Sequence, residues 1–523
     1  MSELQKVFEN KRNTLLYLGS IMTVSLAIRL YYFPINNPLS LDGLNYFVYA
    51  VATSQQGHFP NDVFSTNNGW PTFLSFFFSI FHSPNIIDYM NLQRIVSLTI
   101  AVLTIIPVFL LCSKFVLRPY ALFGTTIFAF DPRLIQNSLL GITEPLFVLL
   151  ITLTLYFSFI RNEKLSFLSF VAVAFCSIVR YEGLLLIIPV SIMFFFNYKI
   201  QKRSLLWYLV GIFIFLLIII PIAYFRIEAG GHDGLVTNIF RGAEFVSVHL
   251  VEGVPHHDDN LGSEGGNKMF YFVLNLITNF SKYLGWVSIP AYWFFVPLGL
   301  YVTIKNRDKR LIPILIFGAT LLISSAYAYG RNLQETRYLL PIIPLFAVLC
   351  SYSYETKKFG LKGKRIIFFA IIGIILFTSL VMADYLKIDY VFDKEIYEVS
   401  KYVFNNTSGV NDYLGNRHLK TVIIESEWPK LPKVNEKGLV FYDLKKFPTD
   451  GFVSLEDYLT LSKESGLTHL VIMEKNKVRF LDEVFKHEER YPYLYKIFDS
   501  SDHGFKNQFR IYKINYELFS LTT

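Results

Sequence analysis

Long apolar runs separated by short charged turns fill the chain from residue 14 to residue 384. A helix needs about 20 apolar residues to cross a bilayer, whereas a run of 10 to 14 is typical of an interfacial segment. The pattern therefore predicts an all-α membrane domain of about eleven transmembrane helices. Their expected bounds are 14–33, 92–112, 119–137, 143–160, 165–179, 183–198, 204–225, 284–304, 311–329, 338–354 and 366–384.

Two shorter helices are expected between the first two spans. Leu44, Phe47, Val48 and Val51 recur at helical spacing, which predicts an amphipathic helix from Leu41 to Thr53 in the membrane interface. The 12-residue apolar run 70–81 is treated as interfacial in the same way.

The basic residues orient the spans. With run 70–81 interfacial, the basic clusters fall on alternating connections, on the side of the N-terminus. A full span there would place them all outside, against the positive-inside rule. We therefore expect a multi-pass protein with a cytoplasmic N-terminus and with loops 34–91 and 226–283 and residues 385–523 outside. The clusters are Lys114/Arg118, Arg161/Lys164, Lys199/Lys202/Arg203, Lys305/Arg307/Lys309/Arg310 and Lys357/Lys358/Lys362/Lys364/Arg365.

Residues 385–523 have the composition of a soluble domain. Strand-like runs at 421–424, 439–442, 467–473 and 509–514 alternate with helical stretches at 455–465 and 478–490. This alternation predicts a small extracytoplasmic α/β domain after a membrane domain of residues 1–384. It has no phosphate-binding glycine motif and no nucleophile elbow, so docking or shielding is the expected role.

Composition narrows the function classes. The chain has 523 residues, is 53% hydrophobic and carries a formal charge of +8. That charge lies at span ends, so we expect membrane lipids and not nucleic acid as its partner. Cys112, Cys176 and Cys350 lie far apart in apolar segments, which argues against disulfides and zinc. Adjacent ligands such as His256 to Asp259 rarely converge on one ion, and we expect no metal and no cofactor.

Candidate chemistry lies on the predicted outer side. From Leu30 to Gln93 there is no Lys or Arg, although the chain has 49 of them. Asp42 is expected in the first turn of its helix, where the helix dipole favours the ionised form that a general base needs. A simple N-terminal cap is the alternative role. A polar recess is expected to be lined by Asp131, Arg133, Glu144, Arg180 and Glu182, with interhelical ion pairing as the alternative.

Asn279, Asn405 and Asn406 lie in Asn-x-Ser/Thr sequons on the predicted outer side, a weak signal of glycosylation. The loop 226–283, which contains Asn279, is long and glycine-rich, as mobile lids are.

Several motifs together resemble those of the GT-C class of polytopic glycosyltransferases, especially the protein O-mannosyltransferase and aminoarabinose-transferase branch. The resemblance covers about residues 14 to 384. It lies in Asp42 in LDGLNYFVYA, Gly57 and Asp62 in GHFPNDVF, Trp70-Pro71, Gln93-Arg94, TEPLF from Thr143, VRYEG from Val179 and RYLLPIIP from Arg337.

The resemblance implies roles for individual residues. Asp42 matches the family's first-loop catalytic base, Glu144 the acid of the second outer loop, and Arg94 the arginine at the outer end of the second span. Asp42-Gly43 stands where the O-mannosyltransferases usually have an acidic pair, which argues against a protein acceptor. The WWD-type motif of the oligosaccharyltransferase branch is absent, which argues against transfer of a whole oligosaccharide.

The implied reaction is transfer of a sugar from a polyprenyl-phosphate donor of the dolichyl type to a hydroxyl of a protein, lipid or glycan acceptor. Arginines neutralise a phosphate leaving group without a metal. Arg94, Arg180, Arg331 and Arg337 are the candidates, with Tyr338 and Asp62 also expected to bind substrate; headgroup anchoring is the alternative for Arg331 and Arg337. A lipid flippase or transporter and a non-catalytic scaffold are the competing classes.

Overall fold

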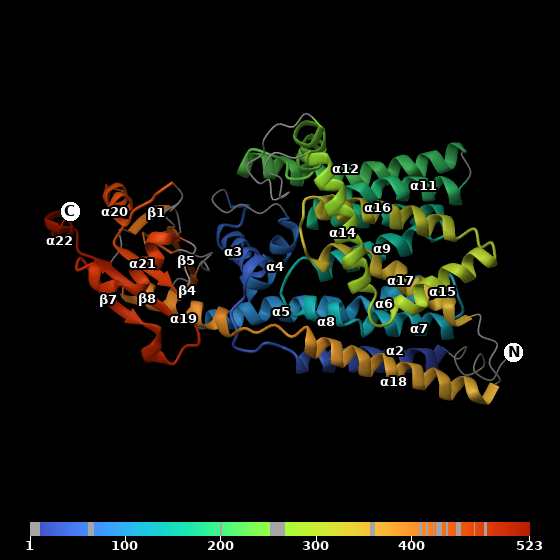
Figure 1. The fold of residues 1–523 in the computed structure, drawn as a ribbon. Helices are drawn as coiled ribbons and strands as arrows, with labels where there is room; N and C mark the ends of the chain where they lie inside the picture. Colours follow the sequence, from blue (N-terminus) through green and yellow to red (C-terminus); the bar gives the residue numbers. More distant parts are fainter. Residues whose placement is uncertain are drawn as a thin grey trace. The chain divides into compact units, whose positions relative to one another are not determined.

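The computed structural model describes residues 11–522 except 61–66, 199–200, 252–266, 356–360, 407–410, 415–416, 422, 425–430, 436–437, 446–450, 465 and 475–477. The chain is mainly helical, with strands confined to its C-terminal part (Figure 1). It divides into two units. The helical unit contains residues 1–34, 58–74 and 93–387, and the mixed unit contains residues 35–57, 75–92 and 388–523. The predicted domain boundary at residue 384 stays a prediction.

The helical unit is built from long apolar helices with short connections. Its helices are α2 (Lys11–Tyr31), α6 (Ile105–Cys112), α7 (Arg118–Ala129), α8 (Pro132–Ser138), α9 (Glu144–Ser158), η1 (Glu163–Leu165), α10 (Phe167–Val179), η2 (Tyr181–Leu186), α11 (Ile187–Asn197), α12 (Lys202–Gly230), α13 (Val236–Glu244), η3 (Phe245–Val251), α14 (Lys268–Ser288), α15 (Tyr292–Lys305), α16 (Leu311–Gly330), η4 (Thr336–Ile342), α17 (Ile343–Glu355) and α18 (Leu361–Tyr385). Helices α4 (Gly69–Ile80) and α5 (Ile86–Leu103) have residues in both units.

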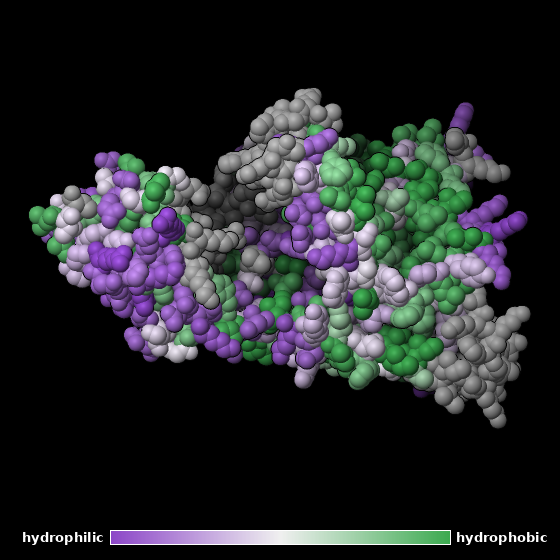
Figure 2. Space-filling view, viewed as in Figure 1, coloured by the Kyte–Doolittle hydropathy of each residue, from purple (hydrophilic) through white to green (hydrophobic). Residues whose placement is uncertain are grey.

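Five helices in the described residues are long and apolar enough to cross a membrane, or up to six if the bent pair α14 and α15 is one span. Exposed leucines and phenylalanines cover α12, and Figure 2 shows the surrounding helices as a largely hydrophobic surface. The chain is therefore a multi-pass membrane protein. The count of about eleven spans and the orientation of the termini stay predictions.

Two predicted spans are interrupted. Within 119–137, α7 ends at Ala129 and Asp131 caps α8 by accepting hydrogen bonds from the N–H groups of Arg133 and Leu134. The continuous helix predicted over 284–304 is wrong, because α14 ends at Ser288 and α15 starts at Tyr292 with a bend of 96°. Pro290 has no N–H to continue the helix. The freed carbonyl of Ile289 accepts a hydrogen bond from Arg133 Nη1 at 2.5 Å.

Several basic turns meet at one end of the helical unit. Arg310 donates to the carbonyl of Lys114 at 3.2 Å, which joins the α15–α16 and α6–α7 turns. Arg203 pairs with Glu163 at 3.3 Å, which joins the start of α12 to the α9–α10 turn. Lys114 lies over the ring of Tyr156, near the end of α9. The structure therefore brings described residues of four predicted basic clusters to one side of the unit. These are the clusters that begin at Lys114, Arg161, Lys199 and Lys305.

In the mixed unit, α3 (Leu41–Gln56) confirms the helix expected from Leu41. Its predicted apolar stripe is buried, with Phe47, Val48 and Val51 at most 1% exposed. Phe47 packs edge-on against Phe78 of α4, with ring centroids 5.4 Å apart. The period of apolar residues was therefore a reliable guide to both the helix and its buried face.

Residues 388–523 confirm the expected α/β pattern. The strands are β1 (Asn411–Leu414), β2 (Arg417–Thr421), β3 (Ile423–Ile424), β4 (Leu431–Asn435), β5 (Gly438–Lys445), β6 (His469–Met473), β7 (Leu494–Asp499) and β8 (Phe509–Ile514). The helices are α19 (Val391–Asn406), α20 (Leu455–Glu464), α21 (Arg479–Lys486), η5 (Glu488–Arg490), η6 (Ser500–His503) and α22 (Tyr516–Thr522). Strand orders are β1-β2-β5-β4 and β3-β6-β8-β7.

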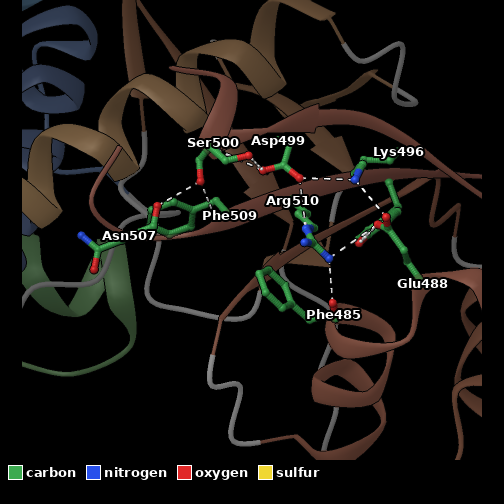
Figure 3. A network of polar contacts seen from close by, with 10 residues as sticks. Phe485, Glu488, Lys496, Asp499, Ser500, Asn507, Phe509 and Arg510 are labelled. Carbon is green, nitrogen blue, oxygen red and sulfur yellow. Dashed lines mark hydrogen bonds and ion pairs between the residues drawn. The ribbon is translucent and has the colours of Figure 1, made fainter. Parts of the chain in front are cut away.

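The second sheet carries helices on both faces. Ile396 and Val399 of α19 pack with Phe509 and Ile511 on one face, whereas α20 and α21 pack on Tyr512 and its neighbours on the other. An ion-pair network ties β7 to β8 (Figure 3): Arg510 contacts Asp499 and the carbonyl of Phe485, and Lys496 bridges Glu488 and Asp499. Each charge has its partner there, as expected of a structural network.

Candidate functional site

Several of the predicted site residues lie at the end of the helical unit that lies away from the basic turns. Glu144 begins α9, Arg180 follows α10 and Arg331 follows α16, whereas the opposite ends of these three helices adjoin basic turns. Three separate helices therefore present charged side chains at one end of the unit.

The turn before Glu144 is held by two side chains from distant parts of the sequence. Gly141 adopts φ +70°, and its carbonyl accepts hydrogen bonds from Trp70 Nε1 at 2.9 Å and from Gln93 Nε2 at 2.7 Å. Trp70 and Gln93 are both fully buried. These contacts give Trp70 and Gln93 of the sequence motifs a structural role. They fix the point where α9 starts and therefore the position of Glu144.

Glu144, Arg180 and Glu182 form one buried ion-pair cluster. Arg180 Nη1 donates to Glu144 Oε1 at 2.7 Å, and Arg180 Nη2 donates to Glu182 Oε1 at 3.0 Å. The exposed fractions of the three side chains are 3%, 12% and 16%. The guanidinium also lies 5.6 Å from the centre of the Phe147 ring. Three of the five residues predicted to line a recess are therefore in contact.

The VRYEG segment folds as a tight connection between α10 and η2. The N–H of Gly183 donates to the carbonyl of Arg180 at 2.8 Å. A Cβ at Gly183 would lie 2.5 Å from the backbone carbon of Cys176, so a larger residue does not fit without moving the backbone. The glycine therefore allows the turn to pack closely on α10, which sets the positions of Arg180 and Glu182.

Arg331 and Arg337 flank a turn that is fixed from several sides. Arg331 stacks on Phe245 of η3, with its guanidinium 5.0 Å from the ring centre. Among the residues that the structure describes, no carboxylate forms an ion pair with it. Arg337 is paired with Glu335 and lies over the ring of Tyr338.

The two groups of residues adjoin one another. Segment η4, which contains Arg337 and Tyr338, contacts α9, which starts at Glu144. Segment η2 also contacts α16. Glu144, Arg180, Arg331, Arg337 and Tyr338 thus belong to one region.

Asn279 helps to hold this turn and is not placed as a glycosylation acceptor. It is 7% exposed within α14, and its Nδ2 donates to the carbonyl of Tyr329 at 3.3 Å and to Asn332 Oδ1 at 3.2 Å. Asn332 adopts a left-handed backbone with φ 62°. The weak glycosylation signal at Asn279 is not supported by this burial, which the local sequence does not report. The side chains of Asn405 and Asn406 lie outside the described residues.

The other predicted site residues, Asp42, Arg94 and Asp62, come from the N-terminal part of the chain. Asp42 is half-buried at the second position of α3, in the mixed unit, and Ser40 occupies the N-cap position in its place. Asp42 is therefore not the N-cap residue of α3. Arg94 lies within α5 and is 1% exposed. Asp62 lies outside the described residues.

Asp131 and Arg133 belong to a second polar cluster. Asp131 caps α8 and lies within electrostatic range of Arg29, which is 1% exposed and donates to Ser138 Oγ at 3.2 Å. Arg133 is bonded to Ile289, as described above. Asp131 thus holds the start of its own helix, and Arg133 joins α8 to the turn between α14 and α15. The ion pairing considered as the alternative role of these two residues stays a prediction. Arg29 and Glu144 both line a narrow, mostly apolar pocket.

No group of three potential metal ligands comes together among the described residues. The residues His256 to Asp259 lie in a stretch, 252–266, that the structure does not describe. The charged groups of the described site are therefore carboxylates and guanidiniums.

No protein-family model matches this sequence, and no curated protein matches it either. Solved structures do match. The oligosaccharyltransferase of Archaeoglobus fulgidus in the apo form aligns with a TM-score of 0.58 at 12% identity, over 94% of this chain and 74% of that one. ArnT from Cupriavidus metallidurans bound to undecaprenyl phosphate aligns with a TM-score of 0.53 at 11% identity, over 95% and 98%.

A third match is AglB from Archaeoglobus fulgidus in complex with an inhibitory peptide and a dolichol-phosphate, with a TM-score of 0.51 at 12% identity, over 89% of this chain and 69% of that one. At these identities the likeness concerns the fold. The chain thus has the fold of GT-C glycosyltransferases, as its sequence motifs suggested.

Proposed function

We propose that this protein is an inverting glycosyltransferase that moves a sugar from a polyprenyl-phosphate donor to an acceptor hydroxyl on the outer face of the membrane. The observation that carries the proposal is the GT-C fold with Glu144, Arg180, Arg331 and Arg337 gathered at one end of the helical unit. Two proteins of this fold have been solved with polyprenyl phosphates, namely ArnT with undecaprenyl phosphate and AglB with a dolichol-phosphate.

In the proposed reaction Asp42 takes the proton of the acceptor hydroxyl. The acceptor oxygen then bonds to the anomeric carbon as the bond from that carbon to the phosphate oxygen breaks, and polyprenyl phosphate leaves. Attack from the face opposite the phosphate inverts the anomeric carbon through an oxocarbenium-like transition state. The position of Asp42 in the first turn of α3 favours its ionised form.

The leaving phosphate needs positive charge. Arg331 is the best-suited arginine of the described site, since the guanidiniums of Arg180 and Arg337 are already paired with carboxylates. Stacking on Phe245 and Tyr327 orients Arg331 without neutralising it. We propose that Arg331 binds the donor phosphate, with Arg337, Tyr338, Arg94 and Asp62 as further ligands of the donor or acceptor.

The gathering of basic turns at the opposite end supports the outer orientation of the site, because cytoplasmic turns are rich in Lys and Arg. A lipid flippase or transporter remains the alternative class. The acceptor class stays open among protein, lipid and glycan.

The test is Asp42→Asn in purified full-length protein, with polyprenyl-phosphate sugar as donor. Asparagine keeps the size of aspartate but cannot accept the proton, so transfer should slow at least ~100-fold while donor binding persists. Glu144→Gln should show a smaller loss, because Glu144 is paired with Arg180 and acts by positioning.

Full transfer activity in Asp42→Asn would refute the assignment. Wild-type protein that moves labelled lipid across vesicles without forming a glycosidic product would instead establish the flippase.

A further inference from the structure

One oxygen of the Glu182 carboxylate is not satisfied by the residues that the structure describes. Oε1 accepts the hydrogen bond from Arg180, whereas Oε2 is buried and meets no hydrogen-bond donor among the described residues. A buried, charged oxygen without a donor costs free energy, and such groups are rare in folded proteins. An oxygen of this kind beside a candidate site indicates that a ligand supplies the donor.

The charges of the cluster restrict the chemistry of that ligand. Arg180 shares its single positive charge between the carboxylates of Glu144 and Glu182, so the three side chains together carry one net negative charge. A phosphate would be repelled there. A carboxylate oxygen only accepts hydrogen bonds, so the matching ligand group is a hydroxyl or an amino group.

The unsatisfied oxygen is held in a fixed place. Glu182 lies one residue after the start of η2, in the turn that Gly183 packs against α10. Arg180, its ion-pair partner, is itself fixed by Glu144 and by the Phe147 ring. An acceptor that is already oriented binds a donor group at a low entropic cost.

The position of Glu182 near Arg331 connects the unsatisfied oxygen to the donor sugar. Segment η2, which contains Glu182, contacts α16, and Arg331 is the C-cap residue of α16. If Arg331 binds the phosphate, the sugar joined to that phosphate extends into the residues that adjoin Arg331.

We infer that Glu182 accepts a hydrogen bond from a hydroxyl or amino group of a sugar ring, and so recognises the sugar and not the phosphate of the lipid donor. This inference rests on the proposed function. The sugar ring of a glycan acceptor offers the same chemistry, and the experiment separates the two sources.

The experiment compares wild type, Glu182→Gln and the control Glu163→Gln in full-length protein. Glu163 also forms an ion pair with an arginine, but at the end with the basic turns. Equilibrium binding is measured for dolichyl phosphate, dolichyl phosphate mannose and dolichyl phosphate glucose. Wild type should bind at least one sugar-bearing lipid more tightly than bare dolichyl phosphate.

Glu182→Gln should weaken binding of that sugar-bearing lipid about 10-fold or more, the scale of one charge-assisted hydrogen bond, and leave bare dolichyl phosphate unchanged. Glu163→Gln should change neither. If donor binding is unchanged but the KM for a glycan acceptor rises, the recognised sugar is that of the acceptor.

Three results would overturn the inference: equal weakening for the bare and the sugar-bearing lipid, no change in donor affinity or acceptor KM, or wild-type binding that does not distinguish the lipids. If Glu182→Gln does not fold, Glu182→Asp keeps the charge but withdraws the oxygen, and the same three comparisons apply. Wild-type protein that binds none of the lipids contradicts the proposed function itself.

Discussion

The two ends of the helical unit both contain arginines, but they differ in how completely those arginines are satisfied. At the end with the basic turns, Arg310 forms a bidentate pair with Asp308, donates to the carbonyl of Lys114 and stacks on Phe115 and Tyr352. At the other end, Arg331 stacks on rings without an ion pair among the described residues, and Glu182 has an unsatisfied oxygen.

This difference separates a structural cluster from a candidate binding site. A polar cluster with every group paired stabilises one arrangement of the chain, whereas a partly paired one carries a cost that a ligand can remove. Natural sequences keep such unmet groups mainly where they function. We therefore propose that the first end stabilises the fold and that the second end binds a ligand.

The largest effect is expected when the cation between the two buried carboxylates is removed. Arg180→Met leaves Glu144 and Glu182 without their ion-pair partner, and loss of one partner of a buried pair costs about 3–5 kcal/mol. Arg203→Met is the control, because Arg203 is 69% exposed and its pair with Glu163 belongs to a class worth about 0–1 kcal/mol. Thermal unfolding in nanodiscs measures both variants.

Equal stability of these two variants would show that the site end is no more tightly coupled than the exposed basic turns. The comparison would then lose its energetic basis.

The second effect is on ligand binding, and we expect opposite results for an arginine at each end. Arg331→Gln should weaken binding of bare dolichyl phosphate by about 10- to 100-fold, since a hydrogen bond to a charged group contributes about 1.5–3 kcal/mol. Its unfolding temperature should barely change. Arg310→Gln should do the reverse, with lowered stability and normal binding.

Unchanged affinity in Arg331→Gln would remove this arginine from the phosphate site and favour its alternative role as a headgroup anchor. The candidates left would then be Arg94 and Arg337.

The sequence predicted the local features of this comparison well. Apolar periodicity located α3 and its buried face, because both depend on residues close in sequence. The number of spans stays a prediction. Charged residues near the ends of short predicted spans also indicated one polar recess that includes Glu144 and Arg180, and these two side chains are in contact.

Contacts between distant segments could not be predicted in the same way. No periodic pattern in the sequence predicts the hydrogen bonds from Trp70 and Gln93 to the Gly141 carbonyl. The same holds for the stacking of Arg331 on Phe245. The break after Ser288 was missed because the apolar pattern continues through Pro290, although the proline was a usable warning. Arg29 was missed because an isolated cation near a span end also fits a headgroup anchor.

The smallest expected effect concerns pH at the satisfied end. Burial alone would raise the pKa of the Asp308 carboxyl, but hydrogen bonds from Arg310 and Tyr352 outweigh burial and lower the pKa from 3.8 to about 2. Because the pKa is lower in the folded state, the stabilisation is fully present above pH 3.8 and is lost as the pH falls towards 2. For a partly exposed ion pair it should amount to at most about 1 kcal/mol.

Asp308→Asn should therefore be less stable than wild type by the same small amount at pH 8 and at pH 5, and the two proteins should converge below pH 3.8. Unfolding in nanodiscs at pH 8, 5 and 3 measures this difference, with Arg310→Gln as a companion that removes the same pair from the cation side. A stability difference that grows on acidification would contradict the ion pair. It would also show that the polar groups at the basic end are not fully paired. The two ends of the helical unit would then no longer differ in this respect.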